Sequence, residues 1–130
     1  MTGNKFLLDT NIITAWLKGE VSIADKIDKA KEVYIPIIVV GELYYGALYS
    51  THVQKNIRDI QNITGRYNVL QIDEETTITY GNIKAVLRKK GKPIPENDIW
   101  IAAIAQRYQL TLVTRDKHFK EIESLTLKNW

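Results

Sequence analysis

The sequence contains no cysteine, and long apolar runs are also missing from its 130 residues. Without cysteine there is no disulfide framework and no thiolate metal site, as expected of a protein in the reducing cytosol. The longest apolar runs, such as Ile35–Val40 and Ile99–Ala105, fall far short of the roughly 20 residues that a membrane helix needs. The segment before Phe6 is too short for a secretory signal. We therefore expect a cytoplasmic protein with no membrane span.

The composition is that of an ordinary folded domain. Apolar residues make up 45% of the chain and charged residues 25%, which allows a real core to be buried. A length of 130 residues is typical of one domain, so we expect a single domain over residues 1–130. The 18 basic and 15 acidic side chains give a net charge of +3, which permits a nucleic-acid partner without requiring one. The glycine-rich nucleotide loops and the Gly-x-Ser-x-Gly elbow of serine hydrolases are absent.

Short apolar runs alternate with segments of helical periodicity along the chain. The runs predict strands at residues 5–9, 33–36, 67–72 and 110–114, with a weak fifth strand at an edge over 125–127. The periodic segments predict helices at residues 10–17, 23–30, 39–49, 53–63, 74–90 and 97–108, with Gly65 separating the fourth helix from the strand that follows. This order predicts an α/β fold with one parallel sheet covered by helices on both faces. Ligands bind such sheets at the carboxyl ends of the strands.

Two aspartates follow predicted strands at that edge. Asp9 ends the first strand and Asp116 lies just past the fourth, so both carboxylates should project from the same side of the sheet. The alternative is that Asp9 is a turn residue and Asp116 a helix cap. As a pair at one edge, they are harder to explain by local turns alone.

Two further carboxylates occupy apolar helical patterns. Glu42 lies in the most apolar helix of the chain, where an unpaired buried charge would need a cation; the alternative is a solvent-exposed strip of that helix. Asp98 falls in the first turn of its helix, where a capping role is the alternative. Against simple capping, Ile101 and Ala102 follow three and four residues later, so Asp98 begins the apolar stripe.

Four carboxylates that meet in a cleft of low dielectric would repel one another, and a divalent cation is the natural neutraliser. Oxygen ligands without cysteine favour Mg²⁺ or Mn²⁺ over zinc. Such an ion can activate water and offset negative charge on a phosphodiester under attack. Thr10, Asn11 and Thr114 could hold metal-bound water, although capping of the following helix or turn explains them equally well.

The basic residues supply candidate nucleic-acid contacts. Arg88, Lys89, Lys90 and Lys92 form one cluster. Arg115 and Lys117 form a pair on either side of Asp116. The cluster also lies at a predicted helix C-terminus, where positive charge complements the dipole and no ligand is needed. His52 and His118 are isolated, without metal-ligand or catalytic spacing, and we expect both to be surface residues.

Four short motifs together resemble the PIN-domain ribonucleases of the VapC toxin type. In order along the chain, the motifs are LLDTN at 7–11, GELYYG at 41–46, NDIWIAA at 97–103 and TRDKHF at 114–119. The segments GKPIP at 91–95 and LKNW at 127–130 are most similar to the branch of tRNA(fMet)-specific endonucleases. A related PIN protein with a similar third motif is the nuclease-like half of a DNA-binding regulatory complex.

The resemblance implies a three-layer PIN-like domain with a five-stranded parallel sheet, and an Mg²⁺- or Mn²⁺-dependent endoribonuclease acting on RNA. Position by position, Asp9, Glu42, Asp98 and Asp116 match the family's acidic quartet of metal-binding and catalytic residues. A homodimer and a small antitoxin whose C-terminal segment blocks the active site are also implied. Tyr44, Tyr45 and Tyr49 could line either contact, or pack in the core. The alternative function is a non-catalytic subunit of a DNA-binding regulatory complex, with the acidic pocket receiving a partner's arginine.

Overall fold

The chain folds around one parallel sheet in the computed structural model, which describes residues 4–130. Five strands lie in the order β3-β2-β1-β4-β5, and every neighbouring pair is parallel. The strands are β1 (Lys5–Leu8), β2 (Glu32–Pro36), β3 (Asn68–Leu70), β4 (Thr111–Val113) and β5 (Leu127–Lys128). The predicted α/β class with a five-stranded parallel sheet is confirmed.

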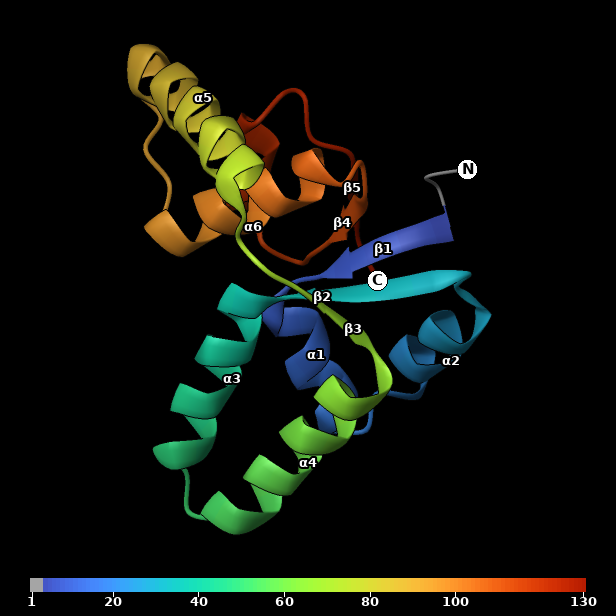
Figure 1. The fold of residues 1–130 in the computed structure, drawn as a ribbon. Coiled ribbons are helices and arrows are strands. Elements are labelled where there is room, and N and C mark those ends of the chain that lie inside the picture. The colour runs from blue at the N-terminus through green and yellow to red at the C-terminus, as the bar shows by residue number, and fades with distance from the viewer. Residues whose placement is uncertain (1–3) are drawn as a thin grey trace.

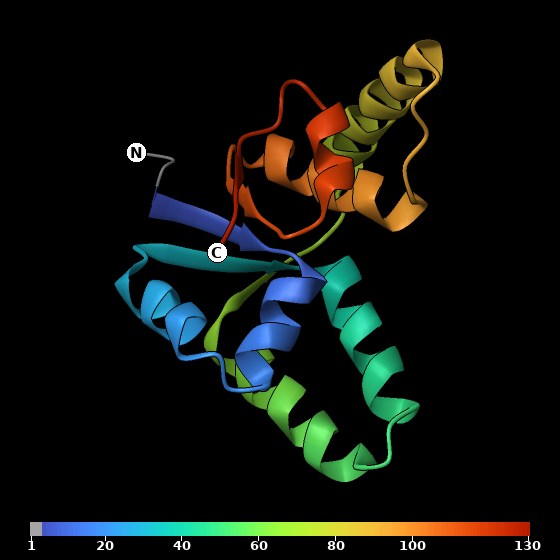
Figure 2. The same cartoon turned by 180° about the vertical axis from the view of Figure 1, so that it is seen from behind.

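Six helices cover the two faces of this sheet. One layer holds α1 (Thr10–Leu17), α2 (Val21–Lys29), α3 (Ile37–Leu48) and α4 (Val53–Arg66), and the opposite layer holds α5 (Glu74–Lys90) and α6 (Glu96–Arg107). Figure 1 and Figure 2 show the sheet between these layers, together with the short 3₁₀ helix η2 (Lys117–Glu121) beside α6. Within residues 4–130, none of the helices has the length and apolar character needed to cross a membrane.

The structure corrects three local predictions. Gly65 lies inside α4, because the helix continues to Arg66 and the Tyr67 N–H still donates to the Ile63 carbonyl. The edge strand is Leu127–Lys128 instead of 125–127, since the Leu125 N–H donates to the Ile122 carbonyl and closes a turn there. The 3₁₀ helix after Asp116 was not predicted, because five residues are too few to show a helical period.

The centre of the sheet places two loops side by side. Leu8 at the end of β1 pairs with Val113 at the end of β4, and the Asp9 N–H donates to the Val113 carbonyl at 3.0 Å. Asp9 and Thr114 are therefore adjacent where the two central strands end. From β1 the chain builds outward to β2 and β3 on one side, and β4 and β5 lie on the other. This is the switch point at which parallel sheets bind ligands.

A core of aliphatic side chains fixes these strands and the loop after β4. Leu7, Leu8, Leu112 and Val113 are fully buried in the two central strands. Phe119 is also fully buried, although it lies in the short η2 segment. A buried aromatic ring in an otherwise exposed 3₁₀ turn anchors that turn against the core.

We predict that Phe119→Ala lowers the free energy of unfolding by about 3–5 kcal/mol, because the truncation leaves a cavity under η2. Urea unfolding followed by circular dichroism measures this. The matched control is Ile78→Ala on α5, whose side chain is 61% exposed and whose loss should change stability by less than about 0.5 kcal/mol. Equal effects of the two substitutions would contradict the anchoring role of Phe119.

Candidate active site

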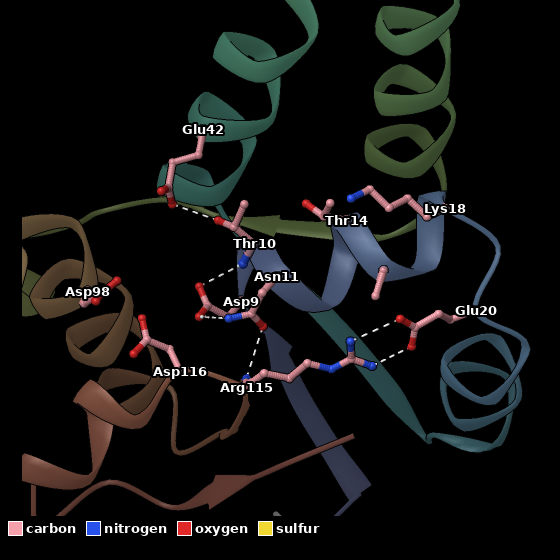
Figure 3. Close-up of a pocket in the computed structure, with 11 residues that line it drawn as sticks. Asp9, Thr10, Asn11, Thr14, Lys18, Glu20, Glu42, Asp98, Arg115 and Asp116 are labelled. Atoms are coloured by element: carbon pink, nitrogen blue, oxygen red, sulfur yellow. Dashed lines mark hydrogen bonds and ion pairs between the residues drawn. The ribbon is translucent and has the colours of Figure 1, made fainter. Parts of the chain in front are cut away.

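A cleft of about 450 Å³ opens where β1 and β4 end. Figure 3 shows carboxylates from four separate parts of the chain facing it: the residue after β1, the second turn of α3, the first turn of α6, and the residue before η2. These are Asp9, Glu42, Asp98 and Asp116. The four carboxylates predicted from strand ends and helix patterns are thus brought together in one place.

Asp9 is the most enclosed of the four, with only 4% of its surface exposed. It caps α1 by accepting a hydrogen bond from the Thr10 N–H at 2.8 Å. Its second oxygen accepts from the Thr114 hydroxyl at 2.7 Å and from the Asn11 amide at 3.3 Å. Burial raises the pKa of Asp9, and these hydrogen bonds partly offset the effect by stabilising the charged carboxylate.

Glu42 is half-buried on α3 and faces the same cleft. The Thr10 hydroxyl donates a hydrogen bond to its Oε1 at 2.8 Å. This bond joins the start of α1 to α3, so Thr10 orients one carboxylate with its side chain and a second, Asp9, with its main chain. The alternative of a fully solvent-exposed Glu42 does not hold.

Asp98 has a strongly perturbed carboxyl group. Burial, followed by the charges of Asp9 and Asp116, raises its pKa from 3.8 to about 6. Its side chain is 15% exposed, against 32% for Asp116. Asp116 caps η2 by accepting from the His118 N–H at 2.9 Å. Asp9 and Asp116 therefore each cap a helix and also face the cleft.

The neutral residues predicted to support the site contact its carboxylates directly. The Thr114 hydroxyl donates to Asp9 and accepts from the Asp116 N–H at 3.0 Å, so it links two of the acids. Asn11 donates to Asp9 through its amide nitrogen, and its amide oxygen accepts from the Arg115 N–H at 3.1 Å. In this arrangement the polar atoms of Thr10, Asn11 and Thr114 are turned toward protein partners.

The basic residues lie at different distances from the acidic cleft. The Arg115 guanidinium lines the cleft but donates to both carboxylate oxygens of Glu20 and to the Trp130 main-chain oxygen. Lys117 is exposed next to Asp116. The cluster of Arg88, Lys89, Lys90 and Lys92 lies at the C-terminal tip of α5, away from α1 and α3 (Figure 1). Sequence reasoning missed Lys18, which also lines the cleft.

His118 corrects one prediction. Its side chain is 55% exposed, as expected of a surface histidine, but it is not isolated. Its Nδ1 lies 3.0 Å from Asp116 Oδ1 and 3.6 Å from Asp98 Oδ2. The sequence carried no signal for these contacts, because they depend on the short 3₁₀ helix that follows Asp116. His52, by contrast, is exposed at the start of α4 and makes no side-chain capping bond.

The donor set suits a divalent cation that prefers oxygen ligands. Carboxylates from Asp9, Glu42, Asp98 and Asp116 face the cleft, and Mg²⁺ and Mn²⁺ are bound by such groups together with water. Asp98, Asp116 and His118 each offer one atom, and those three atoms lie within 4.8 Å of one another. Burial first, and then the charges of Asp9 and Asp116, raise the pKa of Asp98, and a bound cation would offset both effects.

Comparison with known proteins gives a consistent family assignment. The PIN domain family pattern matches residues 6–125. Ribonuclease VapC2 of Haemophilus influenzae is 37% identical over 129 residues, covering 97% of this chain and 98% of the relative. The tRNA(fMet)-specific endonuclease VapC of Shigella flexneri is 30% identical over 129 residues, with the same two coverages.

The fold is shared with solved toxin–antitoxin complexes. In the crystal structure of VapBC2 from Rickettsia felis bound to a DNA fragment from their promoter, one chain superposes with a TM-score of 0.89. The two sequences are 32% identical, and the match covers 96% of this chain and 98% of that one. The similarity therefore extends over nearly the whole of both chains.

We predict that Asp98 contributes stability to the metal-free protein at low pH, and that this contribution is lost as the pH rises from about 4 to about 6. In that range folded Asp98, with a pKa of about 6, binds more protons than unfolded Asp98, with a pKa of 3.8, so ionisation favours unfolding. Asp98→Asn removes this contribution and should make the free energy of unfolding depend less on pH. Urea midpoints measured in EDTA across this range test it, with the exposed Asp25→Asn as the control. A slope unchanged in Asp98→Asn would refute this account.

Proposed function

The chain belongs to the PIN-domain family and, within it, to the VapC ribonucleases of toxin–antitoxin systems, and we propose that its acidic cleft hydrolyses RNA with Mg²⁺ or Mn²⁺. The observation that carries the proposal is the meeting of Asp9, Glu42, Asp98 and Asp116 in one cleft. We place this activity in the cytosol, where RNA is present and where proteins fold without disulfides.

Each residue has a distinct role in the proposed site. Asp9, Glu42 and Asp98 would hold the cation, with Asp116 completing the set or serving a second ion. When bound, the cation supplies activation of water and neutralisation of charge on the phosphodiester. Thr114 and the Thr10 N–H fix the Asp9 carboxylate and favour its charged form, and the Thr10 hydroxyl fixes Glu42. Such fixed ligands place the reacting groups without reorganisation during the reaction.

Transfer RNA is the first substrate class to test. One relative is named a tRNA(fMet)-specific endonuclease, at 30% identity. In this chain the exposed Lys117 next to Asp116, and Lys18 at the rim of the cleft, are placed to meet phosphates close to the scissile bond. The cluster at the end of α5 would contact only a more distant part of the RNA.

A second groove suits the antitoxin. It has a volume of about 440 Å³ and runs between α1, α3 and α4. It shares Thr10 and Glu42 with the acidic cleft, so a segment bound in the groove would reach the site. Tyr45 and Tyr49 stack on the exposed side of α3, whereas Tyr44 is half-buried against the core. We propose that the antitoxin segment occupies this groove; homodimer formation stays a prediction.

The alternative function is a non-catalytic subunit of a DNA-binding complex. A solved VapBC2 complex of Rickettsia felis does bind DNA. Hydrogen-bond donors fix three of the four carboxylates, those of Asp9, Glu42 and Asp116, which favours catalysis over a simple arginine pocket. RNA cleavage by the isolated chain separates the two functions, because a non-catalytic subunit would cleave nothing with either ion.

We predict that Asp9→Asn lowers the rate of RNA cleavage at least about a hundredfold, since the loss of a charged ligand removes much of the several kcal/mol that a bound cation contributes. The assay incubates purified protein with total RNA in Mg²⁺ or Mn²⁺ and maps the cleaved ends. Asp25→Asn on the exposed face of α2 is the matched control and should cleave at the wild-type rate. Full activity of Asp9→Asn in EDTA would exclude a metal-dependent mechanism.

We predict that millimolar Mg²⁺ raises the melting temperature of the wild-type protein near pH 7, because a ligand that binds only the folded state stabilises it. The shift should be smaller in Asp9→Asn and in Asp98→Asn, each of which removes one charge from the cleft. Differential scanning calorimetry measures both effects, with NaCl of matched ionic strength as the control. A shift of the same size in all three proteins would place the ion elsewhere.

A further inference from the structure

One titratable side chain near the cleft has no role in the proposed reaction. The His118 imidazole extends from η2, and its Nδ1 lies 3.0 Å from Asp116 Oδ1 and 3.6 Å from Asp98 Oδ2. Asp116 already receives the His118 main-chain N–H, so its cap does not need the imidazole. The ring is therefore held next to two carboxylates without being required for the local fold.

The short η2 helix explains how this position is held. Asp116 begins the turn, and Phe119, one residue after His118, is fully buried in the core. The buried ring fixes the direction of the turn, so residue 118 is presented to the side where Asp116 and Asp98 lie. Those two carboxylates are the charged groups paired with the imidazole in the part of the chain that the structure describes.

The same distances that make an ion pair also suit three ligands of one cation. Two neighbouring ligands of an octahedral ion with bonds of about 2.1 Å lie about 3 Å apart. The Nδ1–Asp116 separation matches this value, and one atom each from Asp98, Asp116 and His118 lies within 4.8 Å of the others. A nitrogen beside two carboxylate oxygens is also the donor set that suits Mn²⁺ and later transition metals more than Mg²⁺.

We infer that His118 is a nitrogen ligand of the cation held by Asp98 and Asp116, and that it shifts the preference of the site toward Mn²⁺. The inference rests on the proposed metal-dependent function and adds to it a residue that sets ion selectivity. Mg²⁺ binds imidazole weakly and keeps water in its place. With Mg²⁺, therefore, His118 contributes little to affinity, and with Mn²⁺ it contributes a direct bond.

Pulsed electron paramagnetic resonance of the full chain loaded with Mn²⁺ tests the bond directly, without an activity assay. A coordinated imidazole gives strong ¹⁴N modulation, which changes to the ¹⁵N pattern when the protein is labelled with ¹⁵N-histidine. We expect this modulation in the wild-type protein and its loss in both His118→Ala and His118→Gln. Since His52 is the other histidine of the chain, His52→Ala is the matched control and should keep the modulation.

Titration calorimetry with MnCl₂ and MgCl₂ gives the second readout. His118→Ala should weaken Mn²⁺ binding about tenfold or more and Mg²⁺ binding much less, because only Mn²⁺ loses a favourable ligand. Both variants keep the main-chain cap of Asp116 and a surface position, and circular dichroism checks that they fold.

The outcomes separate this inference from the proposed function. Mn²⁺ that binds without ¹⁴N modulation, or modulation that persists in His118→Ala, overturns the role of His118 and leaves the metal-dependent nuclease intact. If neither Mn²⁺ nor Mg²⁺ binds the wild-type chain, both the role of His118 and the proposed metal-dependent function are overturned.

Discussion

Carboxylates that share a cleft repel one another, and the fold must hold them together against that force. Burial adds to this cost: burial first, and then the neighbouring charges, raise the pKa of Asp98 to about 6. The chain opposes it with rigid elements: Asp9 follows a buried central strand, Asp98 starts α6, and Asp116 precedes a 3₁₀ turn anchored by Phe119. Such a site stores unfavourable energy in the free protein, and the bound cation releases it.

Neutral hydrogen-bond donors offset the cost of a buried charge at Asp9 and not at Asp98. Asp9 accepts hydrogen bonds from Thr10, Asn11 and Thr114, which favour its charged form even though it is almost fully buried. Among residues 4–130, Asp98 accepts no such hydrogen bonds and has only its contact with His118, and burial and neighbouring charges raise its pKa to about 6. The hydrogen bonds of this network thus favour the charged form of Asp9, whereas burial and the neighbouring charges oppose the ionisation of Asp98.

The sequence predicted the four acids because each sits at a marked place in a local pattern. Asp9 and Asp116 follow apolar strands, Asp98 opens an apolar stripe, and Glu42 interrupts an apolar helix. Parallel strand order then forces the first two to one edge. The contacts of His118 and Arg115 could not be predicted in this way. They depend on a five-residue 3₁₀ helix and on partners up to 104 positions away, Arg115 with Asn11 for example. No periodicity in a single sequence specifies contacts of that kind.

The hydrogen bonds of the Arg115 guanidinium limit its use as a positive group in the proposed reaction. Its Nε, Nη1 and Nη2 atoms already donate to Glu20 and to the Trp130 main-chain oxygen, and its N–H donates to Asn11. An arginine with its fork filled by a carboxylate has no donors left to clamp a phosphate in two-point fashion. It fastens the loop that carries Asp116 to the connection between α1 and α2. In the proposed reaction, charge on the attacked phosphate would then be offset by the cation, with Lys18 and Lys117 nearby, so the rate would follow the concentration of free divalent metal in the cell.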